Sequence, residues 1–102
     1  MSIVVIGGHD GMHKEYKEII GRRGHQAKVY TQMPPRFEKA IGKPDGVILF
    51  TGTVSHKMIV TAVKEAKKNN IKIIRSHSCS TSSLEGLIQQ METTFSSKPS
   101  TM

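Results

Sequence analysis

The alternation of apolar runs with helix-patterned segments constrains the fold of this chain more than any other feature. The apolar runs cover residues 3–6, 26–31, 47–51 and 71–75 and are typical of strands. A segment that we predict to be helical follows each run. Strands that alternate with helices favour a parallel sheet with helices on both faces, and short right-handed crossovers favour the strand order 2-1-3-4. The sequence therefore predicts an α/β fold, a three-layer flavodoxin-like (Rossmann-like) domain with a four-stranded parallel sheet.

Capping residues set the expected limits of the helices. Asp10 is expected to cap the first helix, and residues 36–41 are expected to form a short second one. Ser55 is expected to cap a long third helix. Ser82 followed by Glu85 matches the capping-box pattern, which predicts the start of the last helix.

The length and composition indicate one domain. A chain of 102 residues has room for a single hydrophobic core. We expect this domain over residues 1–92 and a disordered tail over residues 93–102, where Thr, Ser, Lys and Pro dominate. No apolar run approaches the ~18 residues that span a bilayer, and the N-terminus lacks the features of a signal peptide. The single cysteine, Cys79, fits a reducing compartment, so we expect a cytoplasmic protein with no membrane partner.

An excess of positive charge favours anionic partners. The chain has 15 Lys and Arg against 8 Asp and Glu, a formal charge of +7. Such a charge suits nucleic acid, phosphate-bearing small molecules or a dicarboxylate. A solubilising coat accounts for most of it, and no recognised nucleic-acid motif accompanies it. We therefore keep nucleic acid as a partner but do not favour it.

Three of the five histidines follow predicted strands. His9, His56 and His77 each lie just after an apolar run, so parallel strands would gather them along the carboxyl edge of the sheet. Imidazole binds metals and transfers protons near neutral pH. His56 would begin a helix, whose dipole favours the neutral, ligating form; alone, it would be taken for a solvated first-turn residue. His25 falls at the opposite edge and is expected at the surface.

The reversal in strand order predicts where a ligand binds. In such sheets the ligand lies outside the carboxyl ends of the strands where the order reverses, here between the first and third strands. Residues 7–10, Gly7-Gly8-His9-Asp10, and residues 51–56 would form the two lips of that crevice. The glycines do not match a dinucleotide fingerprint, because Ile6 stands where the first glycine is required. A tight strand-to-helix turn is sufficient to explain them.

Two other functions are open from the residues. Thr51, Thr53 and Ser55 place hydroxyls before a helix start, and residues 76–83 form a serine-rich loop; both could hold phosphate. This predicts a phosphate-, nucleotide- or nucleic-acid-binding regulatory module as the alternative. An enzyme that uses Cys79 ranks last, because nothing places a base beside that thiol. The residues leave open whether the chain is an enzyme, and we favour a non-catalytic protein.

The chain resembles a family of small bacterial domains of unknown function, family 2325. The resemblance extends to about Glu92 and rests on four motifs, GGHD (7–10), TQMP (31–34), TVSHKM (53–58) and RSHS (75–78). Gly11 departs from the pattern, in which a larger and often basic residue is expected. The resemblance implies a haem-binding protein that can carry dioxygen, with His56, His9 or His77 as axial ligand to the iron.

The same resemblance suggests roles for four more side chains and an oligomeric state. Lys57 and Arg75 could pair with the haem propionates, while Met33 and Met58 could contact the macrocycle. One subunit of this size is small for enclosing haem, so a homodimer that shares the ligand is expected. The first-choice function is therefore non-catalytic haem binding at the carboxyl edge of the sheet. The predicted site comprises His9, His56, His77, Gly7, Gly8, Thr51, Thr53, Ser55, Lys57, Met58, Arg75 and Met33, with the three histidines as candidate metal ligands.

Overall fold

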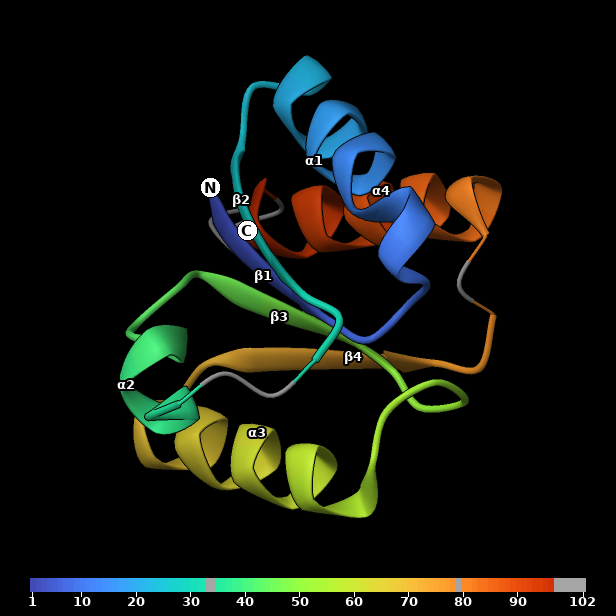
Figure 1. The fold of residues 1–102 in the computed structure, drawn as a ribbon. Helices are drawn as coiled ribbons and strands as arrows, with labels where there is room; N and C mark the ends of the chain where they lie inside the picture. The colour runs from blue at the N-terminus through green and yellow to red at the C-terminus, as the bar shows by residue number, and fades with distance from the viewer. Residues whose placement is uncertain (33–34, 79, 97–102) are drawn as a thin grey trace.

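The computed structural model describes residues 1–32, 35–78 and 80–96, and it has the predicted order of elements (Figure 1). All four strands are parallel, in the order β2-β1-β3-β4. The predicted α/β class and strand order are therefore confirmed. The elements are β1 (Ser2–Ile6), the 3-10 turn η1 (Asp10–Met12), α1 (His13–Arg22), β2 (Gln26–Tyr30), α2 (Phe37–Ile41), β3 (Gly46–Phe50), α3 (His56–Lys68), β4 (Lys72–Ser76) and α4 (Thr81–Ser96).

The sheet is the middle of three layers. Helices α1 and α4 cover one of its faces, and α2 and α3 cover the other (Figure 1). Every residue of β3 is buried, because this strand has neighbours on both sides and helices on both faces. That burial accounts for its nearly continuous apolar sequence.

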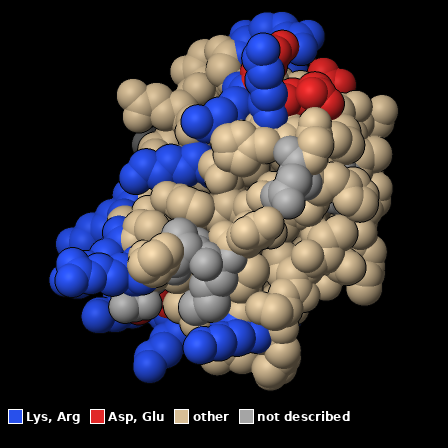
Figure 2. Space-filling model, in the orientation of Figure 1, with Lys and Arg blue, Asp and Glu red and all other residues tan. Residues whose placement is uncertain are grey.

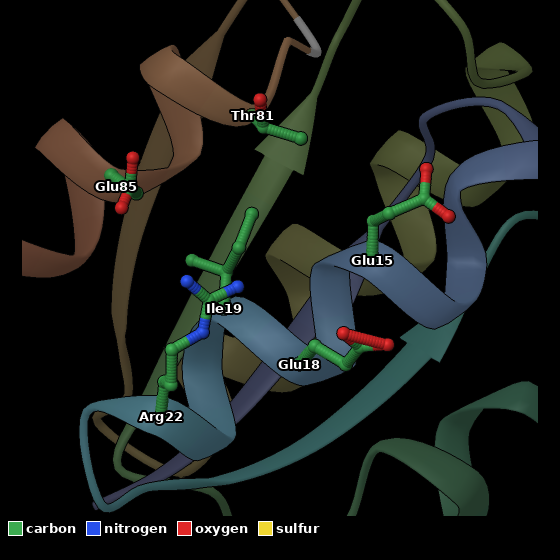
Figure 3. A pocket seen from close by; sticks show the side chains of 6 residues that line it. All are labelled: Glu15, Glu18, Ile19, Arg22, Thr81 and Glu85. Atoms are coloured by element: carbon green, nitrogen blue, oxygen red, sulfur yellow. The ribbon is translucent and has the colours of Figure 1, made fainter.

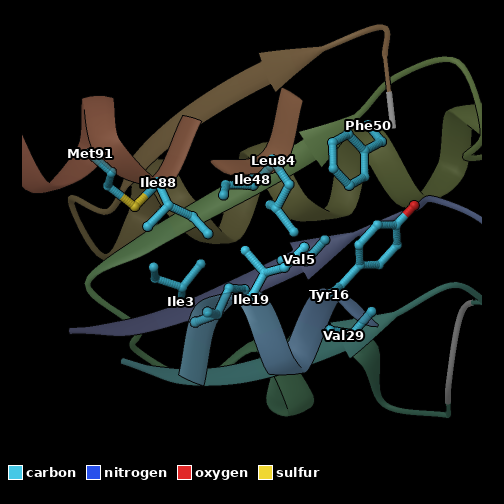
Figure 4. Close-up of a cluster of buried hydrophobic side chains, with 11 residues drawn as sticks. Ile3, Val5, Tyr16, Ile19, Val29, Ile48, Phe50, Leu84, Ile88 and Met91 are labelled. Carbon is cyan, nitrogen blue, oxygen red and sulfur yellow. The ribbon is translucent and has the colours of Figure 1, made fainter. Parts of the chain in front are cut away.

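Alternate residues of β1 and β3 supply the two halves of the core. Ile3, Val5 and Ile48 face α1 and α4, whereas Val4 and Leu49 belong to the cluster under α2 and α3. In the first cluster the rings of Tyr16 and Phe50 lie 5.6 Å apart between centroids (Figure 4). Burying a large aliphatic side chain such as Ile3 or Ile48 stabilises the fold by about 1.5–3 kcal/mol relative to leaving it exposed.

Ser55 caps α3 as predicted, but other helix ends differ from the sequence-based expectation. Oγ of Ser55 accepts a hydrogen bond from the backbone N–H of Met58 at 3.3 Å. The first helical segment opens with the turn η1 at Asp10, and α1 proper follows Met12 without a side-chain cap.

The last helix also starts and ends differently from the expectation. It begins at Thr81, and Oγ of Ser80 accepts from the backbone N–H of Ser83 at 3.2 Å. The predicted capping box at Ser82 is therefore wrong. The helix extends to Ser96, so residues 93–96 belong to it and not to the predicted tail. Residues 97–102 lie outside the described residues.

Within the described part of the chain, no helix has the length and apolar character needed to cross a membrane.

Candidate functional site

A hydrogen bond bridges the predicted crevice between the ends of β1 and β3. The backbone N–H of Gly8 donates to Oγ1 of Thr53 at 2.7 Å. The N–H of Gly7 donates to the carbonyl of Tyr30 at 2.8 Å, and the hydroxyl of Thr53 donates to the carbonyl of Phe50 at 3.2 Å. These amides and this hydroxyl therefore have partners within the protein, and a hydrogen bond joins the two loops.

Gly7 and Gly8 have conformations that suit glycine, and their surroundings are tightly packed. Their φ angles are +102° and +89°. A Cβ at Gly7 would lie 2.6 Å from Cγ1 of Val54, and one at Gly8 would lie 2.5 Å from the ring of Tyr16. The glycines thus let a loop and an aromatic ring approach the backbone closely, which is the structural role that the sequence allowed for them.

The three candidate histidines lie after their strands, as the sequence placed them, and all three are exposed. His9 lies between β1 and η1, and its carbonyl accepts from the N–H of Met12. His56 is the first residue of α3. Nδ1 of His77 lies 3.4 Å from Oγ1 of Thr51. The described residues contain no group of three or more His, Cys, Asp or Glu that could hold a metal ion.

Two surface hollows adjoin at the β4 edge of the sheet. One, of about 370 Å³, is lined by Thr51, Ser76, His77 and Arg75 at the carboxyl ends of β3 and β4. Arg75 also lines the second hollow, of about 440 Å³, on the outer side of α3. We call this second hollow, lined by Ile59, Val60, Val63, Lys64, Lys67 and Arg75, the α3–β4 groove.

The α3–β4 groove combines an apolar floor with a basic rim. Val60, in its floor, is 49% exposed and is the exposed large hydrophobic residue among those described. His56 precedes Ile59 and Val60 by three and four residues, so it lies one turn away on the same side of α3. His77 adjoins through Arg75. Neither imidazole lines the groove itself: His56 begins α3, and His77 lines the hollow that shares Arg75 with the groove.

The other predicted site residues have varied surroundings. Lys57 is exposed beside His56 but does not line the groove. Met58 is 4% exposed, and its side chain packs in the core under α3. Met33 and Cys79 lie outside the described residues.

The serine-rich loop binds mainly to itself. Oγ of Ser83 donates to Oγ of Ser78 at 2.9 Å, and Oγ of Ser80 donates to Oγ of Ser83 at 3.0 Å. Because Ser80 also caps α4, these hydroxyls organise the start of the helix. They remain exposed, and a phosphate would have to displace bonds within this cluster.

Sequence reasoning missed a charged cluster at the opposite end of the molecule. His25, expected at the surface, is half-buried, and its Nε2 lies 2.6 Å from Oε2 of Glu92. Arg23 donates two hydrogen bonds to the same carboxylate, at 2.7 and 3.0 Å. The hydrogen bond from Arg23, followed by that from His25, lowers the pKa of Glu92 to about 2. This cluster ties α4 to the segment between α1 and β2.

A further pocket, of about 250 Å³, lies between α1 and α4 (Figure 3). Glu15, Glu18 and Arg22 extend into it from α1, and Thr81 and Glu85 extend from α4. The sequence could not indicate this pocket, because it depends on which two helices share a face of the sheet.

Comparison with known proteins identifies the family to which this chain belongs. No curated protein and no solved structure matches the chain. One family profile matches residues 2–91, which is nearly the whole chain. The chain therefore belongs to the family described as "Uncharacterized protein conserved in bacteria (DUF2325)".

Proposed function

We propose that this chain is a non-catalytic protein that binds haem in the α3–β4 groove, with His77 or His56 as the axial ligand. The observation that carries the proposal is the position of Arg75. Its side chain lines both the apolar groove and the hollow that contains His77. An apolar surface, a cation and an imidazole are thus neighbours on one edge of the protein.

The groove fits the chemistry of haem, which is a flat apolar macrocycle with two carboxylates. Ile59, Val60 and Val63 offer an apolar floor. Lys64, Lys67 and Arg75 line the same groove, and none of them forms an ion pair within the described residues. Each could therefore pair with a propionate. A haem held by one imidazole keeps its other axial position for a second ligand such as dioxygen.

The openness of the site supports a dimer as the haem-binding unit. The groove and the hollow both lie on the surface, and the imidazoles of His56 and His77 are exposed. One subunit would leave much of a bound haem in water. Two copies that face each other across haem would cover both faces of the macrocycle, with a histidine of one copy on the iron and the other axial position left for dioxygen. We further propose that the protein acts in the cytoplasm, which the single cysteine supports.

Visible spectroscopy during titration with haem tests the proposal. We expect a Soret band distinct from that of free haem, and we expect the His56→Ala/His77→Ala double variant to lose it. His9→Ala is the matched control, since this exposed histidine follows β1 and lines neither hollow. Arg75→Gln should weaken binding by roughly tenfold, because the loss of one charge-assisted bond costs about 1.5 kcal/mol. A spectrum like that of free haem, or one that the double variant leaves unchanged, would refute the proposal.

The alternative is a module that binds a phosphate-bearing small molecule at the start of α4. The exposed hydroxyls of Ser78, Ser80 and Ser83 within bonding distance of one another support it. Fluorescence titration with nucleotides at several salt concentrations separates the two functions. Phosphate binding should strengthen at low salt and should fall in a Ser80→Ala/Ser83→Ala variant, which should leave haem binding intact. No binding at low salt would exclude the alternative.

A further inference from the structure

The positive charge of the chain is concentrated on one side of the sheet. Residues 36–75, which include α2, α3 and β4, contain nine Lys and Arg against three Asp and Glu. Residues 1–25 and 80–96, which include α1 and α4, contain four against five. Figure 2 shows this on one face of the molecule, where red and blue side chains lie together near α1, whereas blue ones dominate around α2 and the adjacent part of α3. Most of the net charge of +7 therefore lies on the α2–α3 side and is not spread evenly over the surface.

Three lysines on this side converge on one hollow. Lys39 and Lys43, from α2 and the turn that follows it, and Lys68, from the end of α3, line a hollow of about 390 Å³. Glu65 and Asn69 also line it, and Nδ2 of Asn69 donates to the carbonyl of Glu65 at 3.1 Å. Among the described residues, ion pairs form only at Glu92. None of the three ammonium groups forms an ion pair with a described residue, although the carboxylate of Glu65 shares the hollow.

We propose that this α2–α3 surface binds the phosphate backbone of duplex nucleic acid. A polymer of phosphates suits a charge that is spread over two helices and an edge strand better than a small anion does. Helix α3 has 13 residues and is therefore about 20 Å long. That length spans about six phosphates of one strand at a rise of about 3.4 Å per nucleotide.

The aromatic residues argue for a duplex and against a single strand. Proteins that bind single strands stack bases on exposed aromatic rings. Here Tyr16, Phe37 and Phe50 are buried, and the hydroxyl of the half-buried Tyr30 donates to the carbonyl of Ala40. Because none of the Tyr and Phe rings that the structure describes is exposed, contact would be with the backbone and insensitive to sequence.

The apolar face of α3 argues against a lipid surface. An amphipathic helix binds a bilayer by burying its apolar face at the interface. The apolar face of α3 is already occupied, because Met58, Ala62 and Ala66 are buried in the domain. A membrane would therefore meet the lysines and the shallow apolar floor of the α3–β4 groove, in which Val60 is the exposed large hydrophobic residue among those described.

Fluorescence anisotropy with a labelled DNA duplex of mixed sequence tests the proposal. With four or five phosphate contacts, the slope of log K against log salt should be about −4. Neutralising the hollow with Lys39→Gln, Lys43→Gln and Lys68→Gln together should make the slope shallower by about 2.7 and weaken binding by at least roughly tenfold at low salt. The three lysines do not line the α3–β4 groove, so haem binding should be unchanged, and the two proposals can fail separately.

A matched variant controls for the loss of net charge. Lys14→Gln, Lys17→Gln and Arg22→Gln remove three exposed cations from α1, on the other face of the sheet. This variant should keep most of the affinity. No binding at low salt, equal losses in the two triple variants, or binding to anionic phosphatidylserine vesicles in preference to the duplex would overturn the proposal.

Discussion

The backbone N–H of Gly8 donates a 2.7 Å hydrogen bond to Oγ1 of Thr53, across 45 residues of sequence. The bond joins the loop after β1 to the loop after β3, where the strand order reverses. In many parallel sheets these two loops separate to admit a ligand. Here they are tied together, and the hollows lie one strand further along, beside β4. This displacement is why we place the ligand at the edge of the sheet.

Replacing Thr53 with Val should destabilise the fold. The change keeps the shape of the side chain but removes the acceptor for Gly8, and we expect a loss of about 0.5–1.5 kcal/mol in the free energy of unfolding. Urea denaturation followed by circular dichroism measures it. Thr53→Ser is the control, because it keeps the hydroxyl. Equal losses in the Val and Ser variants would show that the methyl group, and not the hydrogen bond, matters.

Gly7→Ala should be more costly. The residue has a φ of +102°, and the new Cβ would lie 2.9 Å from the carbonyl oxygen of Phe50, which cannot move without disturbing β3. Strain and overpacking together predict a loss of about 2 kcal/mol or more. Gly21→Ala, in α1 with nothing within 4 Å of its Cβ position, should instead stabilise by about 0.5–1 kcal/mol. Thermal unfolding of the two variants should therefore shift in opposite directions.

The strand order could be predicted because it follows from local pattern and chain connectivity. Each strand is an apolar run beside a helix-patterned segment, and right-handed crossovers leave few arrangements. The start of α4 could not be predicted in this way. Four consecutive Ser and Thr residues, 80–83, stand before Leu84, and each of them can cap a helix. Packing of Leu84 and Ile88 against the sheet decides which residue does so.

Contacts between distant segments explain what else escaped prediction. His25 and Glu92 are separated by 67 residues, and no spacing rule connects them. In the same way, the sequence placed His77 beyond a crevice, whereas Arg75 connects it to a groove that only the packing of α3 beside β4 creates. The end of a strand can be predicted from one segment of the sequence. A groove is formed by two segments, and the sequence pattern does not give their packing.

Gly46 and Met91 should show coupled effects on stability. A Cβ on Gly46, in β3, would lie 2.5 Å from Sδ of Met91, which is fully buried in α4. Gly46→Ala should therefore cost about 1–3 kcal/mol by overpacking, and Met91→Ala about 2–5 kcal/mol by leaving a cavity. In the double variant the new methyl enters the space that Met91 leaves. Chemical denaturation should give a loss smaller than the sum of the two, and simple additivity would contradict this packing.

The Arg23–Glu92–His25 cluster should make stability depend on acidity. The pKa of Glu92 is lowered from 4.5 to about 2 in the folded protein by its hydrogen bonds to Arg23 and His25. A lowered pKa stabilises the fold above the unfolded value and loses that contribution as the pH falls toward the folded value. The contribution of Glu92 should therefore be complete above about pH 5 and should decline between pH 4.5 and 2.

Glu92→Gln isolates this contribution, because it removes the titrating group while keeping a side chain of similar size. The variant should melt at a lower temperature than the wild type at pH 6, and the difference should shrink as the pH falls through the window between 4.5 and 2. Glu18→Gln is the matched control, since Glu18 is exposed on α1 and forms no ion pair within the described residues. A difference in melting temperature for Glu92→Gln that stays constant from pH 6 to pH 2 would mean that the carboxylate acts through its shape and packing, because a contribution from its charge must disappear once it binds a proton.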